Sequence, residues 1–183
     1  IQPKNFDTWV KDQNKNIAAT LSQKEFSGKS GQCHFTFDID GNLQSILAGT
    51  DNTPTFTDGS KIHDAIKSAL SKNTLDNISF ELTAPSLDSD ELERLHIGWG
   101  WASYSFTLYK HADYIKDIKN AALFLSSNIN ANIVQTMVES VCLVRDLVNI
   151  PANDMGPDEL QAATEFLATA HGQKAKYIKD KDL

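Results

Sequence analysis

The chain has 183 residues and a mass of 20.2 kDa, enough for one ordinary core or for one domain and the beginning of another. Hydrophobic residues make up 40% of the sequence and charged residues 22%, as is usual for a soluble globular protein. The net charge of −7 repels phosphate backbones and anionic lipids, which disfavours general binding to nucleic acids or membranes. No apolar run is long enough to span a bilayer, and residues 1–5 show no signal-peptide pattern, so we expect a cytoplasmic protein.

The first 50 residues predict short helices followed by a hairpin. One or two helices within residues 5–26 are suggested by four apolar residues: Trp9, Ile17, Leu21 and Phe26. Two strand-like runs, 33–37 and 43–47, flank Asp40-Gly41, which allows the positive φ angles of a tight turn. The same acidic turn resembles a calcium loop, but an EF-hand needs glycine at its sixth position, where this chain has Leu43. The hairpin turn is therefore the preferred interpretation.

Two amphipathic helices are predicted in the middle of the chain, with a short strand at 77–82 between them. Asp58 and Ser60 can cap the first helix, and Asp88 with Glu91 opens the second in the capping-box pattern. The first carries apolar residues at helical spacing: Ile62, Ala65, Ile66, Ala69 and Leu70. The second carries a similar stripe: Leu92, Leu95, Trp99, Ala102 and Phe106.

Gly98 and Gly100 flank Trp99 within the second helix. Glycine costs about 1 kcal/mol in a helix interior, so the pair predicts close approach to a neighbouring backbone. The triplet is a poor nucleotide loop, because it lacks the third glycine of the dinucleotide fingerprint and lies inside a helix.

The last third predicts a buried strand at 121–125 and a long helix at 129–148. One broad face of that helix is apolar: Ile133, Met137, Val141, Val144, Leu147 and Val148. Pro151 stops this helix, Pro157 begins a final helix through Ala170, and Gly172 ends it. A last strand is predicted at 174–178. Strands alternating with helices indicate an α/β fold with a small mixed sheet flanked by helices, followed by a long helix and an incomplete second α/β unit.

Side chains that could carry chemistry are present, but each set has a simpler interpretation. No short metal-ligand spacing joins the histidines: His34, His63, His96, His111 and His171. Cys33 and Cys142 lie far apart and are interpreted as small buried hydrophobes. An acidic group suits the positive end of a helix dipole better than a metal: Asp88, Asp90, Glu91 and Glu93. An aromatic group is typical of a core rather than of a stacking platform: Trp99, Trp101, Tyr104 and Phe106.

Two stretches of the chain match known sequence patterns. Residues 144–157 read VRDLVNIPANDMGP, which resembles the segment ARDLVNTPANDMTP of the leucyl (cytosol) aminopeptidase family, in which the Asn-x-Pro-Ala-Asn core is the specific part. Residues 98–106 with Tyr109-Lys110 are similar to its pattern GWxxGxYxFxxYK, although Ala102 and Ser105 stand where glycine and arginine are common. The order and spacing of the two stretches also fit the family.

The resemblance implies a macro-domain-like amino-terminal domain at 1–127, a linker helix at 128–149 and the opening of a catalytic domain at 150–183. In the family, two divalent metals, zinc or manganese, activate water against the scissile carbonyl. The family signature Asn-Thr-Asp-Ala-Glu-Gly-Arg is absent here. The resemblance therefore assigns no catalytic residue, metal ligand or bound cofactor to this chain, and the 183 residues alone are predicted to be inactive.

The candidate site is the family segment after the long helix: Asn149, Pro151, Ala152, Asn153, Met155 and Pro157. In the structural interpretation Pro151 and Asn153 shape a turn, with Asn153 or Asp154 capping the next helix. In the functional interpretation the loop borders the active-site cleft of the complete enzyme.

The leading functional hypothesis is the regulatory and assembly portion of a metallo-aminopeptidase that acts on peptides and forms homo-oligomers, hexameric in the family. The alternative is a non-catalytic binding module, because macro domains bind ADP-ribose-like ligands. A small complete enzyme is disfavoured, since no nucleophile, base or metal set is evident. Neither a nucleic-acid partner nor a membrane is expected.

Overall fold

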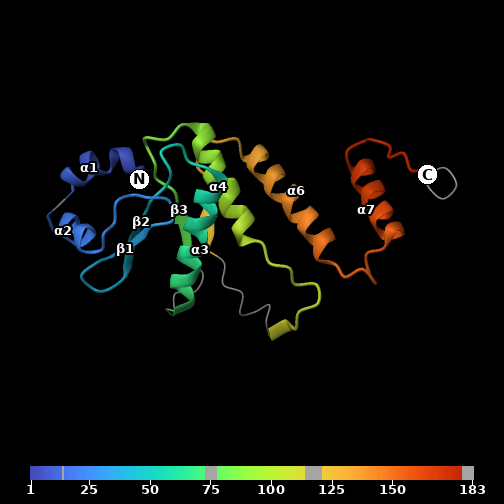
Figure 1. Ribbon diagram of the computed structural model, residues 1–183, viewed down its shortest axis with the longest axis horizontal. Coiled ribbons are helices and arrows are strands. Elements are labelled where there is room, and N and C mark those ends of the chain that lie inside the picture. The colour runs from blue at the N-terminus through green and yellow to red at the C-terminus, as the bar shows by residue number, and fades with distance from the viewer. Residues whose placement is uncertain (14, 73–77, 114–120, 179–183) are drawn as a thin grey trace. The chain divides into compact units, whose positions relative to one another are not determined.

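The computed structural model describes residues 1–13, 15–72, 78–113 and 121–178 (Figure 1). The chain divides into two compact units, Ile1–Glu139 and Ser140–Leu183. The described residues form six helices and four short strands, so the mixed α/β class predicted from the sequence is confirmed. Within them, no helix is both long and apolar enough to cross a membrane.

The chain begins with the two short helices that the sequence predicts, α1 (Pro3–Lys11) and α2 (Lys15–Gln23). Pro3 suits the first turn of α1, where its missing N–H removes no helical hydrogen bond. The rings of Phe6 and Phe26 lie 5.7 Å apart, and Leu21 is fully buried. Phe26, just after α2, therefore packs against α1 and also against His34, at a ring separation of 6.4 Å.

The predicted hairpin consists of antiparallel β1 (Cys33–Phe37) and β2 (Leu43–Ala48). Its turn uses positive φ only at Gly41, where φ is +82°. Asp38 Oδ1 accepts the N–H groups of Asp40 and Asn42, at 2.9 and 2.8 Å. The leading carboxylate of the supposed calcium loop therefore holds the turn, and the hairpin interpretation is confirmed.

Helix α3 (Phe56–Lys72) begins earlier than the sequence predicts. Thr55 precedes the helix, and Asp58 lies inside its first turn, where its carboxylate accepts the N–H of Thr55 at 2.8 Å. Asp58 therefore caps the start of α3 from the third helical position, as one half of a capping box. Ser60 is not a cap, because its hydroxyl donates across to the carbonyl of Gly98 at 2.8 Å, a tertiary contact that a local capping rule does not capture.

Helix α4 (Ser89–Ser103) starts with the predicted capping box. The N–H of Glu91 donates to Asp88 Oδ1 at 2.8 Å, and the N–H of Asp88 donates to Glu91 Oε2 at 3.1 Å. The helix ends at Ser103, so the predicted inclusion of Phe106 is wrong. The Ser103 hydroxyl donates to the carbonyl of Gly100 at 2.8 Å and satisfies one of the carbonyls left free at a helix end.

Helices α3 and α4 touch through their backbones at two glycines, Gly59 and Gly98. The glycine pair in the sequence predicts such a contact, and of that pair Gly98 makes it. A β-carbon on Gly98 would overlap the carbonyl oxygen of Phe56, and one on Gly59 would overlap the carbonyl oxygen of Leu95. Gly100 meets a side chain instead, because its β-carbon would lie 2.5 Å from Val138 Cγ2. Glycine is required where backbones come this close.

The other strands, β3 (Ser79–Glu81) and β4 (Ala122–Phe124), form a parallel pair. The described residues thus contain two two-stranded sheets instead of the one mixed sheet that the sequence predicts. Asn77 of the predicted strand lies outside the described residues. The prediction of a buried strand at 121–125 is wrong in its burial, since Phe124 is 64% and Leu125 50% exposed. Only one face of β4 meets the core, through Leu123.

The core of the first unit lies between α3, α4 and the strands (Figure 1). Its buried members come mainly from the two helices: Ile62, Ile66, Leu70, Leu95, Trp99 and Ala121. Partly buried residues of the strands, and Ile78 just before β3, pack against them: Phe35, Ile46, Ala48, Phe80 and Leu123. Fully burying one large apolar side chain contributes about 1.5–3 kcal/mol, so this cluster is the main source of stability.

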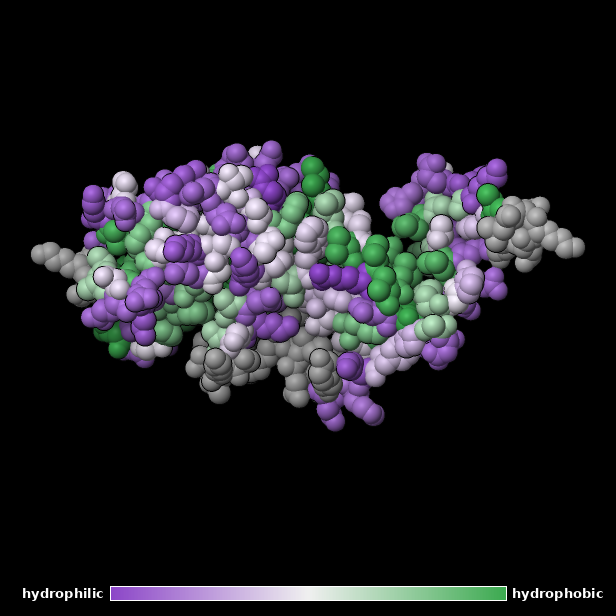
Figure 2. All heavy atoms as spheres, viewed as in Figure 1, coloured by the Kyte–Doolittle hydropathy of each residue, from purple (hydrophilic) through white to green (hydrophobic). Residues whose placement is uncertain are grey.

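Helices α6 (Ala131–Asn149) and α7 (Pro157–Ala170) follow the predicted boundaries. Gly172 ends α7 with φ of +66°. The predicted apolar face of α6 is largely exposed and appears green in Figure 2, with Val148 77% exposed. Residues 174–178 do not form the predicted strand, because a strand needs a neighbour and the described part of 140–183 offers none.

Candidate functional site

The family segment forms the turn between α6 and α7. Asn149 is the last residue of α6, and the N–H of Ile150 still donates to the carbonyl of Asp146 at 3.1 Å. The carbonyl of Pro151 then accepts the N–H groups of Asp154 and Met155, both at 2.9 Å. One turn of chain therefore closes on Pro151, which confirms its predicted role in shaping the turn.

The prediction that Asn153 or Asp154 caps α7 is wrong. The N-cap is Gly156, whose N–H donates to Glu159 Oε2 at 3.1 Å, while Asn153 Nδ2 donates to Asp154 Oδ1 at 3.1 Å. Pro157 occupies the first turn of α7 as predicted. Asn153 and Asp154 cannot cap α7, because both lie in the turn that closes on Pro151 and the helix begins only at Pro157.

The exposure of the segment leaves it available for contacts. Pro151, Ala152, Asn153 and Pro157 are exposed, and Met155 is half-buried. An exposed asparagine beside a proline turn can bind a neighbouring polypeptide through its side-chain amide. The interpretation that this loop borders the active-site cleft of the complete enzyme remains a prediction.

Histidines and acids do not gather into a metal centre in the described part of the chain, where no three His, Cys, Asp or Glu side chains lie together. His96 is buried and its Nδ1 lies 2.8 Å from the carbonyl of Leu92. His34 is half-buried, and burial lowers the pKa of its ring. His111 and His171 are exposed.

His63 is fully buried against Trp99, with ring centroids 5.3 Å apart in an edge-to-face arrangement. Its Nδ1 lies 3.2 Å from Asp64 Oδ1. Burial lowers the pKa of His63, because the charged ring would lose its hydration, and the nearby carboxylate of Asp64 opposes this shift. The folded chain thus favours the neutral ring.

Asp58 is a buried carboxylate that sequence reasoning treated only as a cap. It accepts the N–H of Asp51 at 3.1 Å and the N–H and hydroxyl of Thr55 at 2.8 and 2.9 Å. Burial by itself raises the pKa of Asp58, but hydrogen bonds from Ser30, Thr55 and Asp51 outweigh it and the pKa is lowered. This carboxylate ties the loop after β2 to α3.

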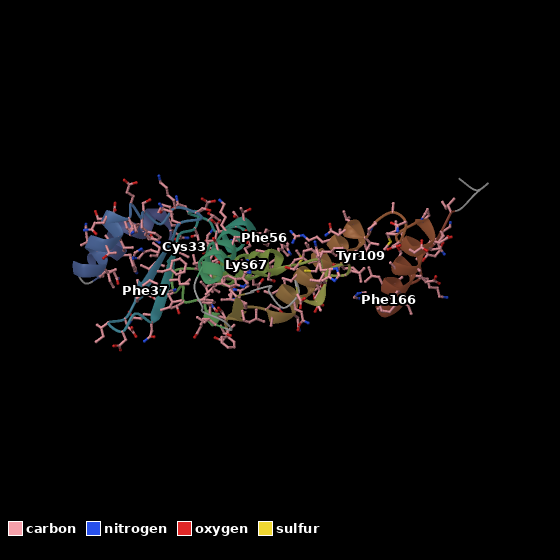
Figure 3. All side chains as sticks on the ribbon, turned by 90° about the horizontal axis from the view of Figure 1, so that it is seen from below. Cys33, Phe37, Phe56, Lys67, Tyr109 and Phe166 are labelled. Carbon is pink, nitrogen blue, oxygen red and sulfur yellow. The ribbon has the colours of Figure 1, made fainter. Side chains whose placement is uncertain are left out.

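The remaining candidate groups are also structural. Of the aromatic group only Trp99 is buried, and its indole N–H donates to the carbonyl of Ala121 at 3.0 Å. Trp101 is half-buried against Phe56, with ring centroids 4.8 Å apart. Cys33 on β1, labelled in Figure 3, and Cys142 on α6 are both half-buried. Burial raises the pKa of Cys33 to about 11, so its thiol is unreactive at neutral pH.

A hollow of about 540 Å³, here named the β2–β3 groove, was not predicted from the sequence. Leu43–Ala48 form one wall and residues 78–84 the other, with Ile1 at one end. Its floor is apolar: Ile62, Ile66, Leu95 and Leu123. No short sequence pattern marks it, because strands distant in the sequence enclose it.

Residues 1–125 match the family described as M17 aminopeptidase, N-terminal domain. The match covers most of the chain and agrees with the α/β unit at Ile1–Glu139. The chain therefore belongs to the M17 aminopeptidase family, as the resemblance of its two motifs indicates.

Curated relatives carry the same description. A probable cytosol aminopeptidase of Corynebacterium glutamicum is 31% identical over 109 residues, covering 57% of this chain and 22% of the relative. Another, of Clostridium perfringens, is 27% identical over 175 residues, covering 87% of this chain and 35% of the relative. The chain thus spans about a fifth to a third of the length of these relatives.

Solved structures extend the likeness over the whole chain. A cytosol aminopeptidase from Coxiella burnetii superposes with a TM-score of 0.73 and 28% identity, covering 100% of this chain and 37% of that chain. The bottromycin maturation enzyme BotP, solved in complex with Mn, superposes with a TM-score of 0.56 over 84% of this chain and 34% of its own. At 18% identity the second likeness shows the fold alone. The chain is thus similar to the amino-terminal region of cytosol aminopeptidases.

Proposed function

We propose that this chain is the amino-terminal regulatory and assembly portion of a two-metal leucyl aminopeptidase, an enzyme that removes amino-terminal residues from peptides. The observation that carries the proposal is the fit of the whole chain to just over a third of the cytosol aminopeptidase from Coxiella burnetii. The family match over residues 1–125 supports it independently. Within this proposal the protein is cytoplasmic and binds neither nucleic acid nor membrane.

The proposed organisation has three parts: an amino-terminal macro-domain-like domain at 1–127, a linker helix at 128–149 and the opening of the catalytic domain at 150–183. Helix α6 supports the middle part, because it spans residues 131–149 without interruption. The turn at Pro151 and the start of α7 at Pro157 support the boundary that follows.

The two divalent metals, zinc or manganese, belong to the remainder of such an enzyme in this proposal. The described residues of this chain do not fit them, since no three potential ligands lie together. Chemistry at a metal is therefore not assigned to any residue here, and no catalytic or metal-binding role is proposed for this chain.

Hydrolysis of a leucine anilide tests the assignment, with added zinc or manganese, for the 183-residue chain beside its full-length parent. Turnover by the parent alone is the expected result. Metal-dependent turnover by the 183-residue chain, with its mass confirmed, would contradict the proposal, because the active site would then lie within this sequence.

The family segment borders the active-site cleft in the complete enzyme under this proposal. Its support is the exposed amide of Asn153, whose only described bond is within the turn, to Asp154. Asn153→Ala in the full-length enzyme should lower turnover without lowering the unfolding temperature. Asn132→Ala, at an exposed asparagine of α6, is the matched control. Equal activity of the two variants would leave Asn153 a turn residue only.

Homo-oligomers, hexameric in the family, are the proposed assembly. Support comes from apolar side chains exposed on α6: Ile133, Met137, Val144 and Val148. Sedimentation of the full-length parent should show one species larger than a monomer. A monomer at every concentration would contradict the assembly role.

ADP-ribose binding would favour the second candidate, a non-catalytic module. The β2–β3 groove is its natural location, but the groove has an apolar floor and no glycine-rich loop among its lining residues, which favours the aminopeptidase. Calorimetric titration distinguishes the two, since saturable heat at micromolar ADP-ribose would indicate a binding module.

A further inference from the structure

Strand β1 forms an edge of its sheet, since among the described residues it pairs with β2 alone. The carbonyl of Gln32, just before β1, accepts the N–H of Gly49 at 2.8 Å, and the N–H of Asp38, just after β1, donates to the carbonyl of Asn42 at 2.9 Å. Gln32 and Asp38 thus direct these backbone groups toward β2. Because backbone groups alternate in direction along a strand, those of the odd-numbered residues point away from β2. These residues are Cys33, Phe35 and Phe37.

The edge of β1 lacks the features that keep natural edge strands apart, which are charged side chains, proline and bulges on the edge strand itself. The strand reads Cys-His-Phe-Thr-Phe, and burial lowers the pKa of His34, which favours the neutral ring. The register shift of the hairpin leaves Gln44 of β2 as the extra residue, so β1 itself is regular. An edge of this kind is suited to pairing with another strand.

Antiparallel pairing of two copies about a two-fold axis at Phe35 satisfies every outward backbone group of β1. In that register Phe35 faces its own counterpart, and Cys33 of each copy faces Phe37 of the other. Each facing pair exchanges two hydrogen bonds. Moving the axis by one residue along the strand would leave the backbone groups of either Cys33 or Phe37 without a partner in β1 of the other copy.

The same register brings opposite charges together. Because the pairing is antiparallel, the hairpin turn of one copy lies beside the loop before β1 of the other. The turn carries the exposed Asp40, and the loop carries the exposed Lys29. Lys61 of α3 adds a second positive charge to this loop, since its Nζ donates to Ser30 Oγ at 3.0 Å. The two-fold axis repeats the contact, so an acidic turn meets a basic loop at each end of the paired strands.

Apolar side chains at the hairpin end of β1 are also uncovered. Phe37 is 55% exposed and Ile39, in the turn, is fully exposed. Figure 3 labels Phe37 and Cys33 at the two ends of the strand. Residues that face each other across an antiparallel pair project their side chains on the same face of the sheet. Phe37 would therefore pack beside Cys33 of the second copy, which removes part of its apolar surface from water.

We propose that the outer edge of β1 binds the same edge of a second copy of this chain, antiparallel about a two-fold axis at Phe35. The two hairpins then form one continuous antiparallel sheet in the order β2, β1, β1, β2. This surface is distinct from the apolar face of α6, and the proposal does not depend on the aminopeptidase assignment.

Sedimentation and amide hydrogen exchange of the 183-residue chain test the proposal together. The amide of Phe35 points outward, whereas that of Thr36 points toward β2 and serves as the internal control. As the concentration rises and a dimer forms, exchange at Phe35 should slow by about tenfold or more, while Thr36 is protected at every concentration. A dimer with unchanged exchange at Phe35, or a monomer at every concentration up to millimolar, would overturn the proposal.

Exchange of the two charges tests the register. Asp40→Lys and Lys29→Asp should each weaken the dimer by about tenfold, because two symmetry-related contacts become repulsive, and the double variant should restore it. Asp7→Lys, at an exposed aspartate of α1, is the matched control with the same change of charge. Equal weakening by Asp7→Lys and Asp40→Lys, or no recovery in the double variant, would refute the proposed register.

Discussion

Replacement of Gly98 by alanine perturbs the backbone contact between α3 and α4. The added β-carbon would overlap the carbonyl oxygen of Phe56 and lie 2.7 Å from its carbonyl carbon, so one helix must move. Overpacking costs about 1–3 kcal/mol, and alanine regains about 1 kcal/mol of helix propensity. The carbonyl group of Phe56 cannot rotate aside as a side chain can, so we take the upper overpacking cost of about 3 kcal/mol. Subtracting the gain in helix propensity leaves a destabilisation of about 2 kcal/mol. In a chain of this size that lowers the unfolding temperature by about 4–8 °C.

Thermal unfolding followed by circular dichroism measures this effect. Gly100→Ala is the matched control on the same helix, because its β-carbon would meet only the Val138 side chain, which can adjust. We expect the loss at Gly98 to exceed that at Gly100. An unfolding temperature for Gly98→Ala equal to or above that of the parent would refute the backbone contact.

Three further predictions concern buried polar groups. Burial lowers the pKa of His63, so the contribution of this residue to stability is complete above its ordinary pKa of 6.5 and is lost as the pH falls below that value. His63→Phe should therefore flatten the dependence of the unfolding midpoint on pH below 6.5, and an unchanged slope would contradict this. Asp58→Asn should cost about 3 kcal/mol in urea unfolding, since one acceptor becomes a donor facing N–H groups; a loss under about 1 kcal/mol would contradict it. With a pKa of about 11 against an ordinary 9.0, Cys33 should react with iodoacetamide at pH 8 about 100-fold more slowly than a free thiol, as mass spectrometry can follow; equal rates would contradict this.

Local chemistry was sufficient to predict several elements from the sequence. The capping box of Asp88 and Glu91, the turn glycine at Gly41 and the limits of α7 at Pro157 and Gly172 were all predicted correctly. Each depends on backbone geometry within a few residues, so the sequence pattern contains the whole cause.

Tertiary contacts explain where the sequence predictions were wrong. Ser60 looks like a cap, but its hydroxyl bonds to α4, and Asp58 accepts a bond from the loop after β2 in addition to capping its own helix. Phe124 lies in an apolar run, yet it is exposed because only one face of its strand meets the core. A single sequence does not specify which of two faces is covered.

The candidate site was predicted only in part. The turn at Pro151 was located correctly, whereas the cap at Gly156 was missed because glycine lacks the side-chain oxygen that marks most N-caps. The β2–β3 groove was missed because residue 1 and the region around residue 49 meet only in the folded chain.

The positions of the tryptophans make the fluorescence of the chain a signal from one unit only. All three tryptophans, Trp9, Trp99 and Trp101, belong to the unit Ile1–Glu139, and residues 140–183 contain none. Indole fluorescence therefore records the melting of the first unit alone, while circular dichroism also records α7 of the second. Comparing the two signals on one unlabelled sample reveals whether the units lose their structure together or one after the other.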